Sequence, residues 1–367
     1  MNMKKCLPIL VCLFMLTNSL YGLAETVPFD DPRWEIKGDK TSVMTFDGKQ
    51  VLYTPGGGAT IKDTGFIDGI IEVDMLFPDD TRGFSGITWR EQDGGFYEHF
   101  YIRPHLSGET DSTQYTPVFN HDSGWQLYFG PQHSVALDLH YNKWMHIKIV
   151  VSGDQAEIYV DDKEPILFIN DLKADLGTGS IGVSTTFAPA YYANFSYEKI
   201  DKPTLKGSPI PAKKAAADLV TQFDISEVVA DGHSKPSDYS GNWSIEKTET
   251  SGTLNISRYR KRSKGNNTVL VRLNINSEVD QIKRFSFGYS DEVIVYINNK
   301  PVSGGSNVYR SRDYRYLGSI GLFDNVYIPL KAGKNEVYFA VKEYFGGWGF
   351  MGKFDDMTGI TLPTEIR

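Results

Sequence analysis

The segment that decides the fold reads Trp144-Met145-His146-Ile147-Lys148-Ile149-Val150, and Gln155-Ala156-Glu157-Ile158-Tyr159-Val160 follows it after a short turn containing Gly153. In both runs apolar and polar residues alternate with a period of two, which is typical of a strand with one face on a core. An earlier run, Ile70-Ile71-Glu72-Val73-Asp74-Met75, shows the same pattern. The chain also has 35 glycines and 13% aromatic residues, and residues 25–200 show no helical periodicity. This half of the sequence therefore predicts an all-β sandwich or jelly roll.

The first residues predict the compartment. Lys4 and Lys5 precede an apolar run over residues 6–16, and Gly22-Leu23-Ala24 supplies small residues a few positions later. This order is typical of a secretory signal peptide, here residues 1–24 with cleavage after Ala24. The apolar run is too short to span a bilayer. We therefore expect a secreted or periplasmic protein with no membrane span in the mature chain.

Charge and cysteine content exclude several classes of protein. Both cysteines, Cys6 and Cys12, lie in the predicted signal peptide, so the mature chain has no disulfide and no thiol chemistry. The mature chain has 36 basic and 46 acidic residues, a net charge of −10, which argues against nucleic acid as a partner. Residues 25–200 have 13 basic and 27 acidic groups (−14), whereas residues 201–367 have 23 and 19 (+4). This uneven division indicates two separate surfaces.

The second half continues the β pattern after a change in composition. Residues 201–215 contain three prolines, which favour extended backbone, and this stretch is the predicted linker. Alternating runs then resume at Thr268–Leu273, Glu292–Ile297 and Asn335–Val341. A second β-sandwich over residues 216–367 accounts for them.

The first half resembles a known family of β-sandwiches. Gly65–Asp74, together with Trp144–Val160 downstream, is similar to the concanavalin A-like lectin/glucanase jelly roll, and the resemblance covers most of residues 40–198. It implies a jelly roll over residues 25–200. The superfamily includes lectins, glycosidases, lyases and adhesion modules, so the resemblance implies contact with carbohydrate and leaves the chemistry open.

A catalytic motif of that family is incomplete here. Some glucanases of this fold carry Glu-x-Asp-x-x-Glu on one strand, which provides the carboxyl pair for retaining hydrolysis. In this sequence Glu72 and Asp74 match the first two acids, and Phe77 stands where the third should be. We therefore interpret Glu72 and Asp74 as outward residues of an alternating strand.

The second half resembles another jelly roll. Asp291–Val302 and Leu330–Val337 are similar to the galactose-binding-like domain appended to many glycoside hydrolases. Asn299 stands where that family usually has a turn glycine. Asparagine tolerates a positive φ, so the turn is expected to survive.

The densest set of candidate ligand-binding residues lies between Phe96 and His105. Alternate residues of a strand share a face, so Tyr97, His99, Tyr101 and Arg103 should project together, toward solvent. Aromatic rings pack on the apolar face of a sugar, and planar donors orient hydroxyl or carboxylate groups. The full candidate set in this half is Arg90, Tyr97, His99, Tyr101, Arg103, His105, Gln114, Tyr115 and Trp125.

Two aromatic segments of the second half are further candidates. Residues 307–316 are rich in arginine and tyrosine, and Tyr344–Phe350 is a glycine-aromatic loop. Either could form a sugar-binding rim, or Trp348 could plug the sandwich. The basic run Arg258–Lys264 is either a solvated loop or an anchor for an acidic polysaccharide or for the acidic first half. The candidate residues are Tyr309, Arg310, Arg312 and Trp348.

The catalytic candidates are Glu98, His99 and His105. Glu98 alternates with the tyrosines and should face the core, where it needs a donor such as Arg90. The sequence does not place a second carboxylate at a defined distance from Glu98, so catalysis is not predicted.

The metal candidates are few, and no cofactor is expected apart from calcium. The spacing of His99, His105 and His121 matches no zinc pattern. Adjacent acids in turns leave calcium open. These acids are Asp79, Asp80, Asp161 and Asp162.

Together these features predict a secreted carbohydrate-binding protein that recognises an oligosaccharide or polysaccharide through aromatic and arginine residues. One alternative is a glycoside hydrolase or polysaccharide lyase with its site in a groove of the first half. Another is an extracellular adhesion or structural protein, which no sequence feature favours.

Overall fold

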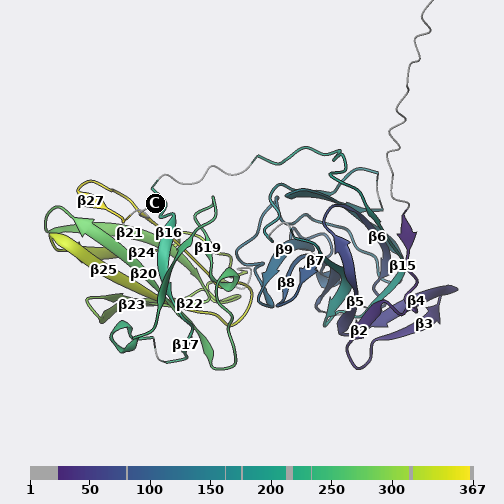
Figure 1. Ribbon diagram of the computed structural model, residues 1–367, viewed down its shortest axis with the longest axis horizontal. Coiled ribbons are helices and arrows are strands. Elements are labelled where there is room, and N and C mark those ends of the chain that lie inside the picture. The colour runs from purple at the N-terminus through teal and green to yellow at the C-terminus, as the bar shows by residue number, and fades with distance from the viewer. Residues whose placement is uncertain are drawn as a thin grey trace, which may run out of the picture.

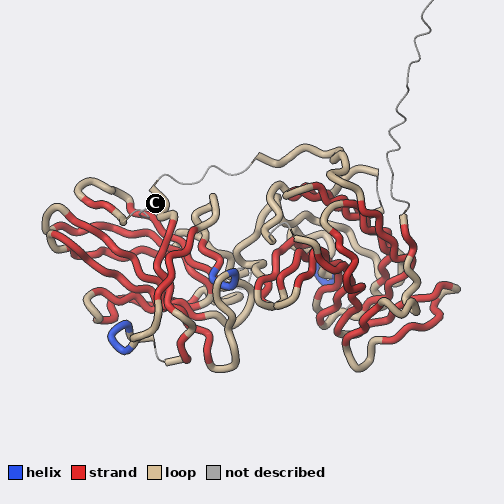
Figure 2. The backbone as a smooth tube through the Cα atoms, viewed as in Figure 1, coloured by secondary structure: helices blue, strands red, loops and turns tan. Residues whose placement is uncertain are grey.

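The structure is a computed structural model that describes residues 24–79, 82–161, 163–174, 177–211, 218–232, 234–313 and 317–363. Residues 1–23 of the predicted signal peptide and residues 212–217, which include part of the predicted linker, lie outside these residues. The described chain is all-β, and its helical content is limited to three 3₁₀ turns (Figure 2). These are η1 (Pro104–Leu106), η2 (Pro236–Asp238) and η3 (Ile256–Arg258). No helix in the described ranges is long and apolar enough to cross a bilayer.

Residues 25–199 form two antiparallel sheets, which gather at one end of the molecule (Figure 1). Sheet I has the order β13-β12-β11-β6-β15-β4-β3, with β1 paired to β15. Its strands are β1 (Glu25–Thr26), β3 (Ser42–Phe46), β4 (Lys49–Thr54), β6 (Gly69–Leu76), β11 (Met145–Ser152), β12 (Gln155–Val160), β13 (Leu167–Ile169) and β15 (Ala190–Lys199). Sheet II has the order β10-β9-β8-β7-β14-β5-β2. Its strands are β2 (Trp34–Lys37), β5 (Gly57–Phe66), β7 (Phe84–Gln92), β8 (Phe96–Ile102), β9 (Thr113–Phe119), β10 (Asp122–Ser123) and β14 (Gly179–Thr186).

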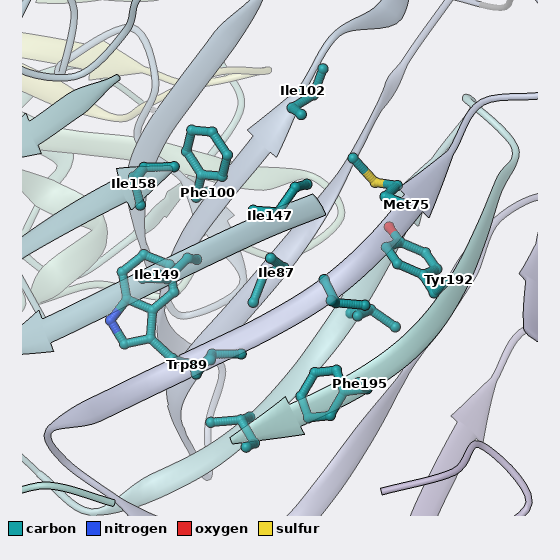
Figure 3. Close-up of a cluster of buried hydrophobic side chains, with 14 of the residues drawn as sticks. Met75, Ile87, Trp89, Phe100, Ile102, Ile147, Ile149, Ile158, Tyr192 and Phe195 are labelled. Atoms are coloured by element: carbon teal, nitrogen blue, oxygen red, sulfur yellow. The ribbon is translucent and has the colours of Figure 1, made fainter. Parts of the chain in front are cut away.

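Sheets I and II pack face to face as the first sandwich. Ile147 and Ile149 of sheet I lie in one cluster with Trp89 and Phe100 of sheet II, all fully buried (Figure 3). Burying one such side chain stabilises the fold by roughly 2–3 kcal/mol, so the core supports a sandwich without disulfides.

Residues 222–361 form two further antiparallel sheets at the other end of the molecule (Figure 1). Sheet III has the order β18-β16-β20-β25-β22-β23, with β17 and β27 paired to β20. Its strands are β16 (Gln222–Ser226), β17 (Val229–Ala230), β18 (Trp243–Lys247), β20 (Asn266–Ser277), β22 (Glu292–Ile297), β23 (Lys300–Ser306), β25 (Gly333–Lys342) and β27 (Ile360–Thr361). Sheet IV has the order β19-β26-β21-β24. Its strands are β19 (Leu254–Asn255), β21 (Gln281–Ser290), β24 (Asp324–Leu330) and β26 (Gly349–Phe354).

Sheets III and IV share a second core, and we call this unit the second sandwich. Phe339 of sheet III packs on Phe285 and Phe350 of sheet IV, with centroid distances of 5.5 and 4.7 Å. Trp348 is fully buried in this core, and its indole N–H donates to the carbonyl of Val341 at 3.1 Å. The interpretation of Trp348 as a plug is therefore confirmed, and its assignment to a sugar-binding rim is wrong.

The strands predicted from alternation are present in both halves. β12 and β22 have the predicted bounds, and β6, β11 and β25 differ from the predicted runs by one or two residues at an end. Asn298 and Asn299 join β22 to β23 with φ values of 51° and 60°. Two positive φ values in a two-residue loop match the right-handed twist of a hairpin, so the expected tolerance of asparagine at the turn is confirmed. The exact domain boundaries stay a prediction.

Candidate functional site

Strand β8 lies between β7 and β9 in sheet II and has the expected alternation. Phe100 and Ile102 point into the core, whereas Tyr97, His99 and Tyr101 are on the opposite face. The expectation that this face is open to solvent is wrong for two of them, because His99 and Tyr101 are 4% and 1% exposed. Phe84 covers Tyr101, with 4.4 Å between ring centroids.

His99 is held as a neutral imidazole on this face. Its Nε2 is 2.8 Å from the hydroxyl of Ser184, and the ring lies 4.9 Å from that of Tyr101. Burial lowers the pKa of His99 to about 3. The side chain can therefore exchange hydrogen bonds but does not contribute a positive charge near neutral pH.

The two sandwiches enclose a cavity of about 400 Å³ beside the end of β8, which we call the aromatic pocket. Four of the predicted ligand-binding residues of the first half and one of the second line it. The lining residues are Arg82, Gly83, Phe84, Tyr101, Arg103, His105, Leu106, Asp111, Trp125, Thr186, Phe187, Tyr309, Leu317 and Phe345. The structure thus brings together side chains that the sequence could only assign to separate segments.

Trp125 is the ring shared by both sides of the aromatic pocket. It is edge-on to Tyr309 and to Phe345, with centroid distances of 6.2 and 6.0 Å. Tyr309 and Phe345 remain 42% and 57% exposed, while Trp125 is 9% exposed. The arrangement is a buried ring that supports two accessible ones. Such accessible rings can pack against the apolar face of a ligand.

Arg103 and His105 add polar groups to the same pocket. Arg103 donates from Nη1 to the carbonyl of Asp111 at 2.7 Å and from Nη2 to the hydroxyl of Tyr101 at 3.0 Å. Its guanidinium lies over the ring of Tyr101 and that of Trp125, 4.9 and 5.5 Å from their centroids. His105 Nδ1 accepts the amide N–H of Gly83 at 3.5 Å.

The other arginine candidates of the second half lie outside the lining. The guanidinium of Arg310 is 4.8 Å from the ring centroid of Tyr309, at the edge of the pocket. Arg312 is used internally, because it donates to Asn307 at 2.8 Å and pairs with Asp324.

Glu98 lies in the core and not in a cleft. Its carboxylate accepts the hydroxyl of Tyr115 at 2.7 Å and the amide of Ala174 at 2.8 Å. Burial raises the pKa of Glu98 to about 7, against the hydrogen bonds from Tyr115 and Ala174, which lower it. A buried carboxyl without access to a ligand does not fit the acid of a hydrolase, so this candidate role is not supported.

Three further ligand-binding candidates are also structural. Arg90 is fully buried and pairs with Asp68 at 2.9 Å. Its acidic partner is therefore Asp68 and not the expected Glu98. Tyr115 is in the core with Glu98. Gln114 is 3% exposed and donates to the carbonyls of Tyr115 and Tyr128 at 2.6 and 2.7 Å. Strand alternation could not show that both faces of β9 are covered.

The segment after β10 joins the two sandwiches. The side-chain amide of Gln126 donates to the carbonyl of Leu317 at 2.9 Å and accepts the hydroxyl of Ser290 at 3.2 Å, and its backbone N–H donates to Gly346 at 2.8 Å. Leu127 and Tyr128 pack with Ile320. Trp125 is therefore held in the pocket by a segment anchored on both sides.

The basic run Arg258–Lys264 also contacts the first sandwich. Arg262 pairs with Asp122 at 2.6 Å, and Arg258 donates to the carbonyl of Lys173 and lies over the ring of Phe119. The interpretation of this run as an anchor to the acidic first half accounts for these contacts.

Glu72 and Asp74 alternate with the core residues Ile71 and Val73 on β6 in sheet I. Lys49 pairs with Asp74 at 3.1 Å, and Lys148 lies 3.9 Å from Glu72. The interpretation of both acids as outward strand residues is confirmed. They belong to the sheet that does not line the aromatic pocket.

No group of three or more His, Cys, Asp or Glu side chains among the described residues could hold a metal ion. Asp161 accepts the backbone N–H of His146 at 2.6 Å, and Asp79 is exposed near the end of β6. Asp80 and Asp162 lie outside the described residues.

Nine of the described lining residues are not among the candidates predicted from the sequence, and Arg82, Phe84 and Phe187 are three of them. Phe187 is 79% exposed, which is unusual for a large apolar side chain, but exposure is not visible in a sequence. Arg82 and Phe84 flank Gly83. A glycine at this position is the one local signal in the sequence that marks a turn beside the pocket.

Similar proteins are found among solved structures only. No protein-family model and no curated protein matches the chain. Among solved structures, the chain is similar to carbohydrate-binding module CBM66 from Bacillus subtilis, with 17% identity over 46% of this chain and 96% of that one and a TM-score of 0.37. It is also similar to a Bacillus licheniformis β-glucanase, with 14% identity over 49% of this chain and 99% of that one and a TM-score of 0.36. A Bacillus subtilis protein of unknown function with a galectin-like fold is similar too, with 13% identity over 50% of this chain and 99% of that one and a TM-score of 0.37.

Proposed function

We propose that the protein binds carbohydrate in the aromatic pocket, without hydrolysing it. The observation that carries this proposal is the convergence of Trp125, Tyr309 and Phe345 with Arg103 on one cavity of about 400 Å³. That volume is within the range of roughly 300–1,000 Å³ that is usual for sites that take small ligands.

The chemistry of the lining suits a sugar. Tyr309 and Phe345 offer exposed ring surface for the apolar C–H face of a pyranose. Arg103 and His105 provide polar groups that can orient hydroxyl groups at the edge of the same ring. A purely apolar ligand would offer no acceptor to the remaining N–H donors of Arg103, which is unfavourable.

The acids near the pocket support binding over hydrolysis. Glycosidases generally need two carboxyl groups on either side of the scissile bond. Among the described lining residues Asp111 is the one acid, and Glu98 is buried in the core. No observation in the described structure favours a lyase or an adhesion role. The proposal that the protein works outside the cytoplasm rests on residues 1–24, of which residues 1–23 lie outside the described structure.

The proposal is tested by a binding assay with a matched pair of variants. The mature protein is passed over a panel of immobilised glycans, and retained glycans are also incubated with it and assayed for new reducing ends. Tyr309→Ala should weaken retention about ten-fold, because a stacked ring contributes on the order of 1 kcal/mol beyond its buried area. Tyr327→Ala removes a tyrosine that is 64% exposed on β24 and absent from the pocket, and it should change nothing.

Two outcomes would overturn the proposal. One is a failure of the protein to retain any glycan of the panel. The other is an equal loss of retention in Tyr309→Ala and Tyr327→Ala. Release of reducing ends by the wild-type protein would refute the part that concerns hydrolysis.

A further inference from the structure

We infer that the saccharide held in the aromatic pocket carries an anionic group, a carboxylate or a sulfate ester, and that Arg103 and Arg82 bind this group. The inference rests on the proposed function and adds the chemical class of the ligand. It is drawn from the distribution of arginine partners over the whole described molecule.

Most arginines in the described ranges have an acidic partner. Seven of these eleven residues pair with a carboxylate within 4.0 Å, namely Arg33, Arg90, Arg260, Arg262, Arg272, Arg284 and Arg312. Of the other four, Arg258 donates to the carbonyl of Lys173, and Arg82, Arg103 and Arg310 form no such pair within the part of the chain that the structure describes. Arg82 and Arg103 line the aromatic pocket, and Arg310 lies over the ring of Tyr309 at its edge. The unpaired guanidinium groups are therefore gathered at one place.

Their position is notable because the surrounding half of the chain is acidic. Residues 25–200 carry a net charge of −14, so carboxylates are plentiful as partners, yet neither Arg82 nor Arg103 pairs with one among the described residues. Asp111, the one acid among the described lining residues, meets Arg103 through its backbone carbonyl. A local positive charge inside an acidic domain concentrates anions where the rest of the surface repels them.

The hydrogen bonds and ring contacts of Arg103 also favour the binding of an anion. Two of its five N–H donors are used, by the carbonyl of Asp111 and the hydroxyl of Tyr101, and the others remain for a ligand. Contacts with the rings of Tyr101 and Trp125 fix the guanidinium plane. A guanidinium group that is held in one orientation loses little conformational entropy when it binds a carboxylate or a sulfate through two parallel hydrogen bonds.

The experiment compares three oligosaccharides of equal length by calorimetric titration into the mature protein. They are a neutral galacto-oligosaccharide, an oligogalacturonide that carries carboxylates and a sulfated galacto-oligosaccharide. At least one charged probe should bind about ten-fold or more tightly than the neutral probe, and this preference should fall as salt is raised, because ions screen the attraction. The charged probe that binds identifies the anionic group.

Variants separate the role of charge from that of packing. Arg103→Gln and Arg82→Gln should each reduce affinity for the preferred charged probe more than for the neutral one. Arg82 is exposed, so its variant keeps the test valid if Arg103→Gln fails to fold. Arg284→Gln is the control, since Arg284 pairs with Asp355 in the second sandwich and does not line the pocket.

The possible results distinguish the two proposals. Equal affinity for neutral and charged probes would overturn the anionic inference and leave carbohydrate binding standing, and so would an equal effect of Arg103→Gln and Arg82→Gln on both kinds of probe. Failure to bind these probes and every glycan of the panel would overturn both.

Discussion

Trp125 of the first sandwich meets Phe345 of the second edge to face, with 6.0 Å between ring centroids. Neither sandwich encloses the aromatic pocket alone, because its lining comes from both. Binding at this pocket should therefore depend on how firmly the sandwiches are docked as well as on the rings themselves.

Trp125→Ala should reduce glycan retention and also lower stability. The substitution removes the ring that supports Tyr309 and Phe345 and leaves a cavity, at a cost of about 3–5 kcal/mol for a buried tryptophan. Glycan retention and thermal unfolding measure the two effects. Trp144→Ala is the matched control, because Trp144 contacts Asp47 and Lys49 and is absent from the pocket lining. Unchanged retention in Trp125→Ala would contradict this role.

Gln126→Ala should loosen the contact between the sandwiches. The change removes the donor to the carbonyl of half-buried Leu317, and it leaves Asp291, at 3.4 Å, as the acceptor of the buried Ser290 hydroxyl. Unsatisfied buried groups cost about 1–3 kcal/mol each. Small-angle X-ray scattering should show a larger radius of gyration than in the wild type, and glycan affinity should fall. Scattering and affinity equal to those of the wild type would show that other contacts suffice.

Glu98 should contribute a fall in stability as pH rises from about 4 to about 7, opposite in sign to the contribution of His99 and His133, whose pKa values burial lowers to about 3 and about 4. The pKa of Glu98 is raised to about 7 by burial, while an unfolded glutamate titrates near 4.3. The unfolded chain therefore loses its proton first, and between these values each increase in pH favours unfolding. The full effect is on the order of 3 kcal/mol and is complete above about pH 7.

Glu98→Gln should remove the Glu98 contribution, because the amide has no proton to lose. Asp291 and Glu343 should contribute declines of the same sign as Glu98, since burial raises the pKa of Asp291 to about 6 and that of Glu343 well above its usual range. Denaturant unfolding at a series of pH values measures the difference. Parallel profiles for the variant and the wild type would be inconsistent with a buried, protonated Glu98.

Glu72→Gln and Asp74→Asn should leave glycan retention unchanged. Both acids lie on sheet I, away from the pocket lining, and contact lysines near the surface. Such exposed pairs contribute at most about 1 kcal/mol. A loss of retention beyond about two-fold in either variant would place a second site on sheet I.

The turn at Asn299 offers a test of backbone chemistry. Its φ of 60° suits glycine better than a β-branched residue. Asn299→Gly should be neutral or slightly stabilising, and Asn299→Val should cost about 1–2 kcal/mol, as measured by thermal unfolding. Equal stability of the two variants would mean that the hairpin relaxes to another turn.

The sequence by itself determined the β class, the positions of the main strands and the outward direction of Glu72 and Asp74. The reason is that side chains of a strand alternate between its two faces, so a local pattern records which face is buried. The same rule assigned Tyr97, His99 and Tyr101 to one side of β8, and the core placement of Phe100 and Ile102 agrees with it.

Only the tertiary structure decided which of these residues a ligand could reach. Alternation cannot show that Phe84 covers Tyr101, that Glu98 is satisfied by Tyr115 and Ala174, or that Trp348 fills a core. The pocket joins segments far apart in the chain, and its shape depends on how two separate cores dock. No local pattern records such a contact, because it is set by packing between surfaces rather than by the period of either strand.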